Sequence, residues 1–265
     1  MTDKAIASEI HKYLLPYAKD IIIETVDEIG STNDELKKRA LLGEKEITLL
    51  IAESQTKGKG SKGRAFFSPE STGCYMSFLL RPDYSAEECT LLTTMAAAAT
   101  AESIEKVSGQ KAQIKWVNDI YIERRKVAGI LTEASIAKGG GGLDYAVVGI
   151  GINIAQPEGG FPDEIKNIVA AVSSSCTKIK NHLIGEVINR FIYYYRNLPK
   201  KEYLTEYRKR LFFLGEDVTV VEGDKTYAAK AVDIDDMCHL IVKNEAGEMK
   251  TLFGGEISIR PEMRY

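Results

Sequence analysis

The change of sequence texture near residue 214 constrains the fold of this chain more than any other feature. Before it, apolar β-branched runs alternate with segments of helical periodicity. After Gly215, only short strand-like runs separated by turn residues remain. The length of 265 residues also favours roughly two domains. We therefore expect an α+β domain over residues 1–213 and a small all-β domain, a five-stranded barrel, over 214–265.

Strand-like and helix-like runs fill the first part of the chain. Strands are predicted, from β-branched and apolar content, at 21–26, 47–52, 74–80, 113–117, 120–122, 127–136 and 145–154. Helices are predicted, from apolar spacing, at 5–19, 86–107, 183–195 and 202–211. A further helix should begin at a capping box formed by Thr32 and Glu35. The glycine run 139–142 predicts a hairpin between the last two strands.

Charge and cysteine spacing exclude several classes of protein. Lys+Arg is 35 and Asp+Glu is 38, a net charge of -3, so the chain lacks the positive field of a dedicated nucleic-acid binder. The four cysteines show no C-x-x-C spacing, which disfavours a structural zinc site or a disulfide framework. No apolar run is long enough for a membrane span, and no signal peptide is recognisable. These features predict a cytoplasmic protein.

A cationic, glycine-rich loop lies at residues 57–64. Four cations and three glycines alternate there without an acidic residue. Glycine lets backbone N–H groups approach an anion, and the cations add attraction, so the loop suits phosphate groups. A solvated surface loop is the competing interpretation. The G-x-G-x-x-G match is discounted because a strand, not a helix, should follow Gly63, and Arg64-Ala65 replaces the Lys-Ser/Thr of a P-loop.

A second cluster, Lys115–Asp119, places a cation, an aromatic ring, an amide and a carboxylate within five residues. Lys126 follows at the start of an apolar strand, where two small residues leave room for a ligand. Asn118 and Asp119 fit a β-turn equally well, and Trp116 alone is typical of a core side chain. Asp119 is also a candidate for holding Mg²⁺ together with substrate phosphates.

Two glycines interrupt the apolar run that ends at Asn153. Gly149 and Gly151 within a strand indicate the close approach of a ligand or of another stretch of backbone, or else a β-bulge. Asn153 offers both a donor and an acceptor at the strand end.

Taken in order, these segments resemble the biotin–protein ligases. The segments that carry the resemblance are Gly30–Asn33, 52–64 with Phe67-Ser68-Pro69, Lys115–Asp119, 125–131, Gly149–Asn153 and Gly254–Arg260. The resemblance implies an α+β fold of the class II synthetase type: a mixed sheet flanked by helices, followed by a small SH3-like β-barrel. Only about 20 residues precede the first predicted strand, so the chain resembles the form without an N-terminal DNA-binding domain.

The same resemblance implies two half-reactions. Biotin and MgATP would give biotinyl-5′-AMP and pyrophosphate, and a lysine of a biotin carboxyl carrier protein or carrier domain would then take the biotinyl group. ATP and Mg²⁺ are the implied cofactors, and the carrier is the implied partner. Nucleic acid and membrane are not implied as partners, and a homodimer is allowed.

The resemblance also assigns residues. Biotin contacts are implied at Ser31, Thr32, Asn33, Gln55, Lys59, Gly60, Ser61 and Lys126. Nucleotide or phosphate contacts are expected at Lys59, Lys62, Arg64, Asn118 and Asn153. Lys126 is the expected catalytic residue, bridging the biotin carboxylate and the α-phosphate, and Asp119 is the expected metal ligand. Lys59 and Ser61 stand where the family loop usually has arginine, which predicts either weaker retention of the adenylate or compensation by Lys62.

Three other interpretations compete with this one. Lipoate–protein ligase uses the same adenylation chemistry, but the 58–64 loop and the 254–260 segment favour biotin. A non-catalytic ligand-binding scaffold would retain the fold without ATP turnover. A dinucleotide oxidoreductase is weakened by the absence of a predicted helix after Gly63.

Overall fold

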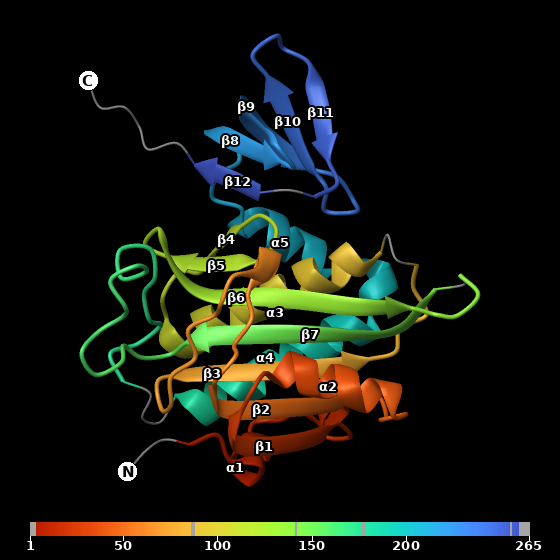
Figure 1. Ribbon diagram of the computed structural model, residues 1–265, viewed down its shortest axis with the longest axis vertical. Helices are drawn as coiled ribbons and strands as arrows, with labels where there is room; N and C mark the ends of the chain where they lie inside the picture. Colours follow the sequence, from red (N-terminus) through yellow and green to blue (C-terminus); the bar gives the residue numbers. More distant parts are fainter. Residues whose placement is uncertain (1–3, 86–87, 141, 176–178, 255, 260–265) are drawn as a thin grey trace.

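A computed structural model describes residues 4–85, 88–140, 142–175, 179–254 and 256–259. Two sheets organise the chain (Figure 1). The first has the strand order β1-β2-β3-β7-β6-β5-β4, and only its β1–β2 pair is parallel. Its strands are β1 (Ile22–Ile29), β2 (Thr48–Gln55), β3 (Gly73–Leu80), β4 (Gln113–Lys115), β5 (Asp119–Ile122), β6 (Arg125–Ile136) and β7 (Leu143–Asn153).

The second sheet is antiparallel and has the order β11-β10-β9-β8-β12. Its strands are β8 (Asp217–Glu222), β9 (Lys225–Ile234), β10 (Leu240–Asn244), β11 (Met249–Leu252) and β12 (Glu256–Ile259). The helices are α1 (Ala7–His11), η1 (Pro16–Ala18), α2 (Thr32–Leu41), η2 (Ser61–Gly63), α3 (Cys89–Ser108), α4 (Lys180–Arg196), η3 (Leu198–Lys200) and α5 (Tyr203–Arg210). The expected α+β class, a mixed sheet with helices followed by a small β unit, is confirmed.

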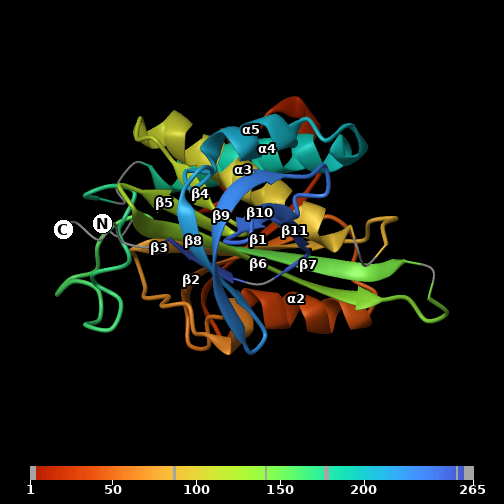
Figure 2. The ribbon, with the colours of Figure 1, turned by 90° about the horizontal axis from the view of Figure 1, so that it is seen from above.

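Helices cover both faces of the first sheet (Figure 2). The large core lies on the α3 and α4 side, where the alanine-rich stretch 96–99 is fully buried and lets α3 approach the sheet closely. A smaller core lies under α2, where Leu36 and Ala40 pack against Leu50, Leu79 and Val147. Because β3 is buried on both faces, its sequence reads as one continuous run rather than an alternation. None of the described helices is long and apolar enough to cross a membrane.

Two local predictions are corrected by the structure. The helix expected over 5–19 is broken into α1 and η1, because Pro16 has no N–H to continue the helical hydrogen bonding. The start of α2 is one residue earlier than the capping box predicted: Ser31 is the N-cap and accepts from the Asp34 N–H at 3.4 Å. Glu35 bonds Arg39 instead of the cap. The predicted start of α3 at Ala86 lies outside the described residues.

The second sheet lies beyond the β4 end of the first sheet, next to α5 (Figure 1). The expected domain boundary at 213/214 falls in the segment between the end of α5 at Arg210 and the start of β8 at Asp217. The five short runs predicted after Gly215 correspond to the five strands β8–β12.

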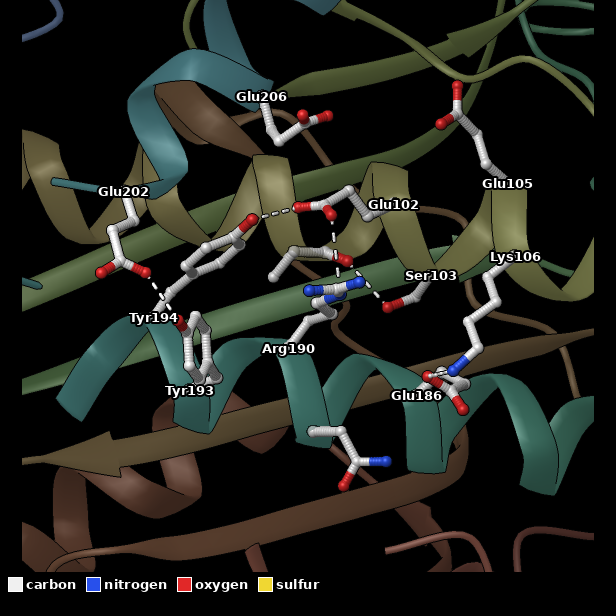
Figure 3. Close-up of polar contacts among 12 residues, drawn as sticks. Glu102, Ser103, Glu105, Lys106, Glu186, Arg190, Tyr193, Tyr194, Glu202 and Glu206 are labelled. Atoms are coloured by element: carbon white, nitrogen blue, oxygen red, sulfur yellow. Dashed lines mark hydrogen bonds and ion pairs between the residues drawn. The ribbon is translucent and has the colours of Figure 1, made fainter. Parts of the chain in front are cut away.

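Polar contacts fasten α3 to α4 (Figure 3). The Tyr194 hydroxyl donates to the Glu102 carboxylate, and Lys106 Nζ lies 2.8 Å from Glu186 Oε2. Burial, together with the hydrogen bond to Glu102, raises the pKa of the Tyr194 hydroxyl, which therefore keeps its proton. These contacts stiffen the helical layer that supports the sheet from behind.

Candidate active site

Three adjoining cavities lie between the N-terminus of α2, strands β6 and β7, and the loop that joins β2 to β3. Their volumes are about 40, 190 and 360 Å³, and we call them the first, second and third cavities. Ser61 lines all three. Lys126 lines the first and the third, and Asp119 lines the second and the third. The structure therefore brings the two predicted motif clusters to one place.

The first cavity is lined by all eight residues at which the resemblance implies a biotin contact. These are Ser31, Thr32, Asn33, Gln55, Lys59, Gly60, Ser61 and Lys126. Apolar wall comes from Met76, Ile130 and Ile150, while Phe66 and Tyr75 add aromatic surface. A cavity that combines a polar end with apolar walls suits a ligand that has a polar head on an aliphatic chain.

The polar end of the first cavity is a hydrogen-bonded wall. Gln55 Oε1 accepts from the Thr32 N–H at 2.9 Å. The Ser77 hydroxyl lies 2.7 Å from Thr32 Oγ1 and 2.6 Å from Asn33 Oδ1. Thr32, Asn33 and Ser77 are almost fully buried. Satisfied buried polar groups are held firmly in place, so this wall presents fixed donors and acceptors.

A charged network stands beside that wall. Asp34 Oδ1 lies 2.6 Å from Lys59 Nζ and 3.0 Å from Lys37 Nζ, and Lys37 also bonds Glu133. Glu133 Oε2 in turn accepts from Asn33 Nδ2 at 2.9 Å. Burial alone would raise the pKa of Asp34, but the hydrogen bonds from Lys59 and Lys37 outweigh it and lower that pKa. The network thus ties the cationic loop to helix α2.

The glycines of β7 make room for neighbouring side chains. A Cβ on Gly149 would lie 2.2 Å from Asn33 Oδ1, and a Cβ on Gly151 would lie 2.6 Å from the Phe66 ring. The β3–β7 pairing continues regularly through both positions, so the bulge interpretation is wrong. The close neighbours are the Asn33 and Phe66 side chains rather than another stretch of backbone, and the approach of a ligand stays a prediction.

The cationic loop folds back on itself. The Gly60 N–H donates to the Arg64 carbonyl at 2.7 Å, and Lys59 bridges to Ala65. The intervening turn η2 includes Lys62 with a φ of 56°. Lys62 and Arg64 line the second cavity, and Arg64 also lines the third. A strand, β3, follows the loop, which agrees with discounting the dinucleotide fingerprint.

Lys126 occupies the border between the first and third cavities. Its Nζ lies 2.6 Å from Asp119 Oδ1. Its backbone pairs with the 168–170 segment: the Lys126 N–H donates to the Ile168 carbonyl at 2.9 Å, and the Ala170 N–H donates to the Lys126 carbonyl at 2.8 Å. A Cβ on Gly129 would come within 3.1 Å of the Lys126 ammonium. The amine is therefore held in one place by backbone on one side and a carboxylate on the other.

The second and third cavities differ in character. Positive side chains from the loop line the second cavity together with Lys115. The third is mainly apolar and aromatic, with walls from Phe66, Phe67, Tyr121, Phe161, Ile165, Ile168 and Val169. One therefore suits phosphates and the other a flat aromatic group.

Asn118 and Asn153 line cavities as expected, but each amide group is already engaged. Asn118 Nδ2 donates to the Ile130 carbonyl at 2.7 Å, and the Ile130 N–H donates back to the Asn118 carbonyl at 2.9 Å. Asn153 Nδ2 donates to the Ala170 carbonyl at 3.3 Å. The turn predicted at Asn118 is confirmed, because residues 116–118 connect β4 to β5.

Asp119 is the one carboxylate among the described residues that line the three cavities. Within the described part of the chain, no three His, Cys, Asp or Glu side chains gather into a metal site. Mg²⁺ is commonly held by one or two carboxylates and completed by substrate phosphates. The donor set here therefore fits a metal that arrives with a nucleotide.

Some site residues were missed by sequence reasoning. Ser77 and Glu133 reach the polar wall from strands distant in sequence, and the 161–169 segment closes the third cavity. A hydroxyl within the apolar run of β3 was one available signal for Ser77. The apolar residues of the 161–169 segment, where only a loop was predicted, were another.

Two family models match this chain. The biotin/lipoate A/B protein ligase family matches residues 26–153, and the biotin protein ligase C terminal domain matches residues 213–260. Among curated proteins, the bifunctional ligase/repressor BirA of Bacillus subtilis is 32% identical over 243 residues, covering 88% of this chain and 72% of that protein. The biotin–acetyl-CoA-carboxylase ligase of Mycobacterium tuberculosis is 29% identical and covers 82% of each chain.

Solved structures agree with these matches. The Aquifex aeolicus biotin protein ligase in complex with biotin and ATP superposes with a TM-score of 0.72 at 27% identity. The match covers 91% of this chain and 99% of that one, so it includes both sheets.

Proposed function

Because the chain belongs to the biotin protein ligase family, we propose that it activates biotin with ATP to biotinyl-5′-AMP and transfers the biotinyl group to a lysine of a biotin carboxyl carrier protein or carrier domain. In this proposal, residues 1–213 are the catalytic domain and 214–265 the SH3-like C-terminal domain. The observation that carries the proposal is the position of Lys126 between a cavity suited to biotin and one suited to a nucleotide.

Biotin is assigned to the first cavity. Its ureido ring has two N–H donors and one carbonyl acceptor, which need fixed hydroxyl and amide partners. The wall formed by Ser31, Thr32, Asn33 and Gln55 offers them. The valeryl chain would then run along Ile130 and Ile150 towards Lys126, which brings the carboxylate to the border with the third cavity.

ATP is assigned to the other two cavities. Lys62 and Arg64 would neutralise phosphates in the second, and the aromatic walls of the third would take the base. Asp119 would hold Mg²⁺ together with the phosphates, and the ion would neutralise charge there when bound. Asn118 lines the second cavity and Asn153 the third, where each would contact the nucleotide.

The first half-reaction joins two anions. A biotin carboxylate oxygen attacks the α-phosphorus, and the bond to the β-phosphate oxygen breaks, releasing pyrophosphate. Lys126 bridges the attacking carboxylate and the α-phosphate, and its fixed positive charge stabilises the charge that accumulates between them. The loop 57–64 then covers the mixed anhydride and excludes water that would hydrolyse it.

The second half-reaction uses the anhydride as an acyl donor. The ε-amine of a carrier lysine attacks the acyl carbon, the bond to the phosphate oxygen breaks, and AMP leaves while the amine loses a proton. The product is an amide. The identity of the carrier rests on the names of relatives such as the Mycobacterium tuberculosis ligase.

The test is incubation of the protein with ATP, Mg²⁺ and biotin, followed by mass spectrometry for biotinyl-5′-AMP and by biotin-dependent exchange of pyrophosphate into ATP. Lipoate replaces biotin in a parallel reaction, because the matched family also contains lipoate ligases. We expect an adenylate to form in the reaction with biotin and not in the reaction with lipoate. Adenylate with lipoate alone, or with neither acid, would contradict the proposal.

A further inference from the structure

The turn that carries Lys115 and Asp119 to the cavities is held from outside the first sheet. It connects β4 and β5. Contacts to the neighbouring strand β6 come from Asn118, through the paired bonds with Ile130, and from Asp119, which lies 2.6 Å from Lys126 Nζ. β4 is the last strand of its sheet and is only three residues long. A short edge strand supports such a turn from one side only, so contacts from outside the sheet also help to fix its position.

Two of those contacts come from α5 and the second sheet. The Trp116 indole N–H donates to the Cys238 carbonyl at 2.9 Å, across 122 positions of sequence. The Tyr207 hydroxyl donates to the Val117 carbonyl at 2.9 Å. Trp116 is 5% exposed and Tyr207 is fully buried, so both bonds are shielded from water. Successive residues of one turn are thereby tied to two different elements.

The Cys238 carbonyl is itself presented by a well-ordered turn. Asp235 Oδ1 accepts from the Met237 N–H at 2.9 Å and from the His239 N–H at 2.8 Å. Asp235 Oδ2 lies 2.9 Å from His239 Nδ1. With its backbone amides bound to one carboxylate, this turn gives the Trp116 N–H a stationary partner.

Helix α5 provides a second connection between the second sheet and the β4–β5 hairpin. Arg208 binds β9 through the Asp233 carboxylate and the Ile234 carbonyl, at 3.1 and 2.9 Å. Arg210 binds Glu105 of α3, and Glu105 accepts from the Ala112 N–H at 3.0 Å, just before β4. The helix therefore spans from the second sheet to the base of the β4–β5 hairpin.

We propose that Tyr207, together with Trp116, whose side chain also lines the second cavity, positions the nucleotide half of the site, so that α5 and the second sheet fix Lys115 and Asp119. The proposal rests on the proposed function. It assigns the C-terminal unit an effect on ATP rather than on biotin, because none of these contacts involves the polar wall of the first cavity.

The test compares Tyr207→Phe and Trp116→Phe with wild type in biotin-dependent pyrophosphate exchange. Each variant removes one donor and keeps most of the ring. We expect the KM for ATP to rise about 3- to 10-fold in each, the usual size of one hydrogen bond. Biotin affinity, measured by calorimetry without ATP, should stay within about twofold of wild type.

Tyr203→Phe is the matched control. Tyr203 lies on the same helix and is equally buried, but its hydroxyl lies near Thr94 Oγ1 and Cys238 Sγ and does not reach the 115–119 turn. It should leave the KM for ATP unchanged, while thermal unfolding reports the general loss of a buried hydroxyl. The double variant Trp116→Phe, Tyr207→Phe should depart from additivity because both residues hold one turn.

Several outcomes would overturn the inference. An unchanged KM for ATP in both variants would do so, as would an equal loss of biotin affinity or the same rise in the Tyr203→Phe control. These results differ from failure of the proposed function, in which the wild-type protein itself would show no biotin-dependent exchange.

Discussion

The polar wall of the first cavity and the cationic loop beside it contribute to the same site in different ways. Thr32, Asn33 and Ser77 are buried, and the Ser77 hydroxyl bonds both of the others. The loop 57–64 is largely exposed, and its hydrogen bonds are mostly internal or made to its own base. The wall presents fixed donors and acceptors, whereas the loop presents charge on backbone that can rearrange at lower cost.

This difference separates recognition from closure. A neutral ureido ring needs directional partners, so its site belongs on a rigid scaffold. Phosphates are recognised mainly by charge, which acts over longer distances and tolerates movement. Changes in the wall should therefore cost stability as well as affinity, and changes in the loop should cost activity alone.

The largest effect is expected at Lys126, which lies between the first and third cavities. Lys126→Ala should lower kcat for adenylate formation about 10²- to 10³-fold, the usual result of losing one charge-stabilising donor. Pyrophosphate exchange measures it. Lys12→Ala, which removes an exposed lysine paired with Glu9 away from the three cavities, is the control and should have wild-type activity. Retained activity in Lys126→Ala would remove this residue from the mechanism.

The rigidity of the wall can be tested at Gly149. Gly149→Ala places a methyl group 2.2 Å from Asn33 Oδ1, so the wall must shift. We expect a loss of about 1–3 kcal/mol in the free energy of unfolding, measured in urea, together with weaker biotin binding. Gly30→Ala is the control, since its Cβ would meet nothing within 4 Å. Equal stability of the two variants would show that the wall is not rigid.

Asp34 connects helix α2 to Lys59 of the cationic loop, and its contribution to stability should depend on pH. Its pKa in the folded protein lies below the ordinary value near 3.8, so its stabilising effect is present above about pH 4 and is lost as pH falls through the folded pKa. The stability difference between wild type and Asp34→Asn should therefore be constant from pH 8 to about pH 5 and shrink below about pH 4.

Chemical unfolding across that pH range measures the difference. Asp163→Asn, at an exposed pair that solvent screens, should change stability little at any pH. A difference between wild type and Asp34→Asn that grows towards acid pH would refute the assignment.

The smallest effect is expected in the loop. Ser61→Arg adds a charge where all three cavities meet, and it should slow the release of biotinyl-5′-AMP about threefold or more. Filtration of pre-formed adenylate measures release, and Ser61→Ala is the uncharged control. Stability should not change. Equal release from Ser61→Arg and wild type would count against a retaining role for loop charge.

Local sequence patterns predicted much of the secondary structure. Apolar and β-branched runs predicted most strands, and apolar spacing predicted most helices, because burial repeats about every 3.6 residues in a helix. The helix prediction was wrong over 5–19, where the apolar spacing continued across Pro16. The structure brings together the eight positions at which the resemblance implies biotin contacts, since all of them line one cavity, and their role stays a prediction.

The sequence by itself predicted the change from mixed helices and strands to short strands alone near residue 214, and it located the cationic loop. Only the tertiary structure decided the partners of the site residues: Ser77 and Glu133 for Asn33, Asp119 for Lys126, and Cys238 for Trp116. The reason is physical. Secondary structure and turns depend on neighbours along the chain, whereas these pairs depend on strand register and on how two sheets pack, which no local pattern encodes.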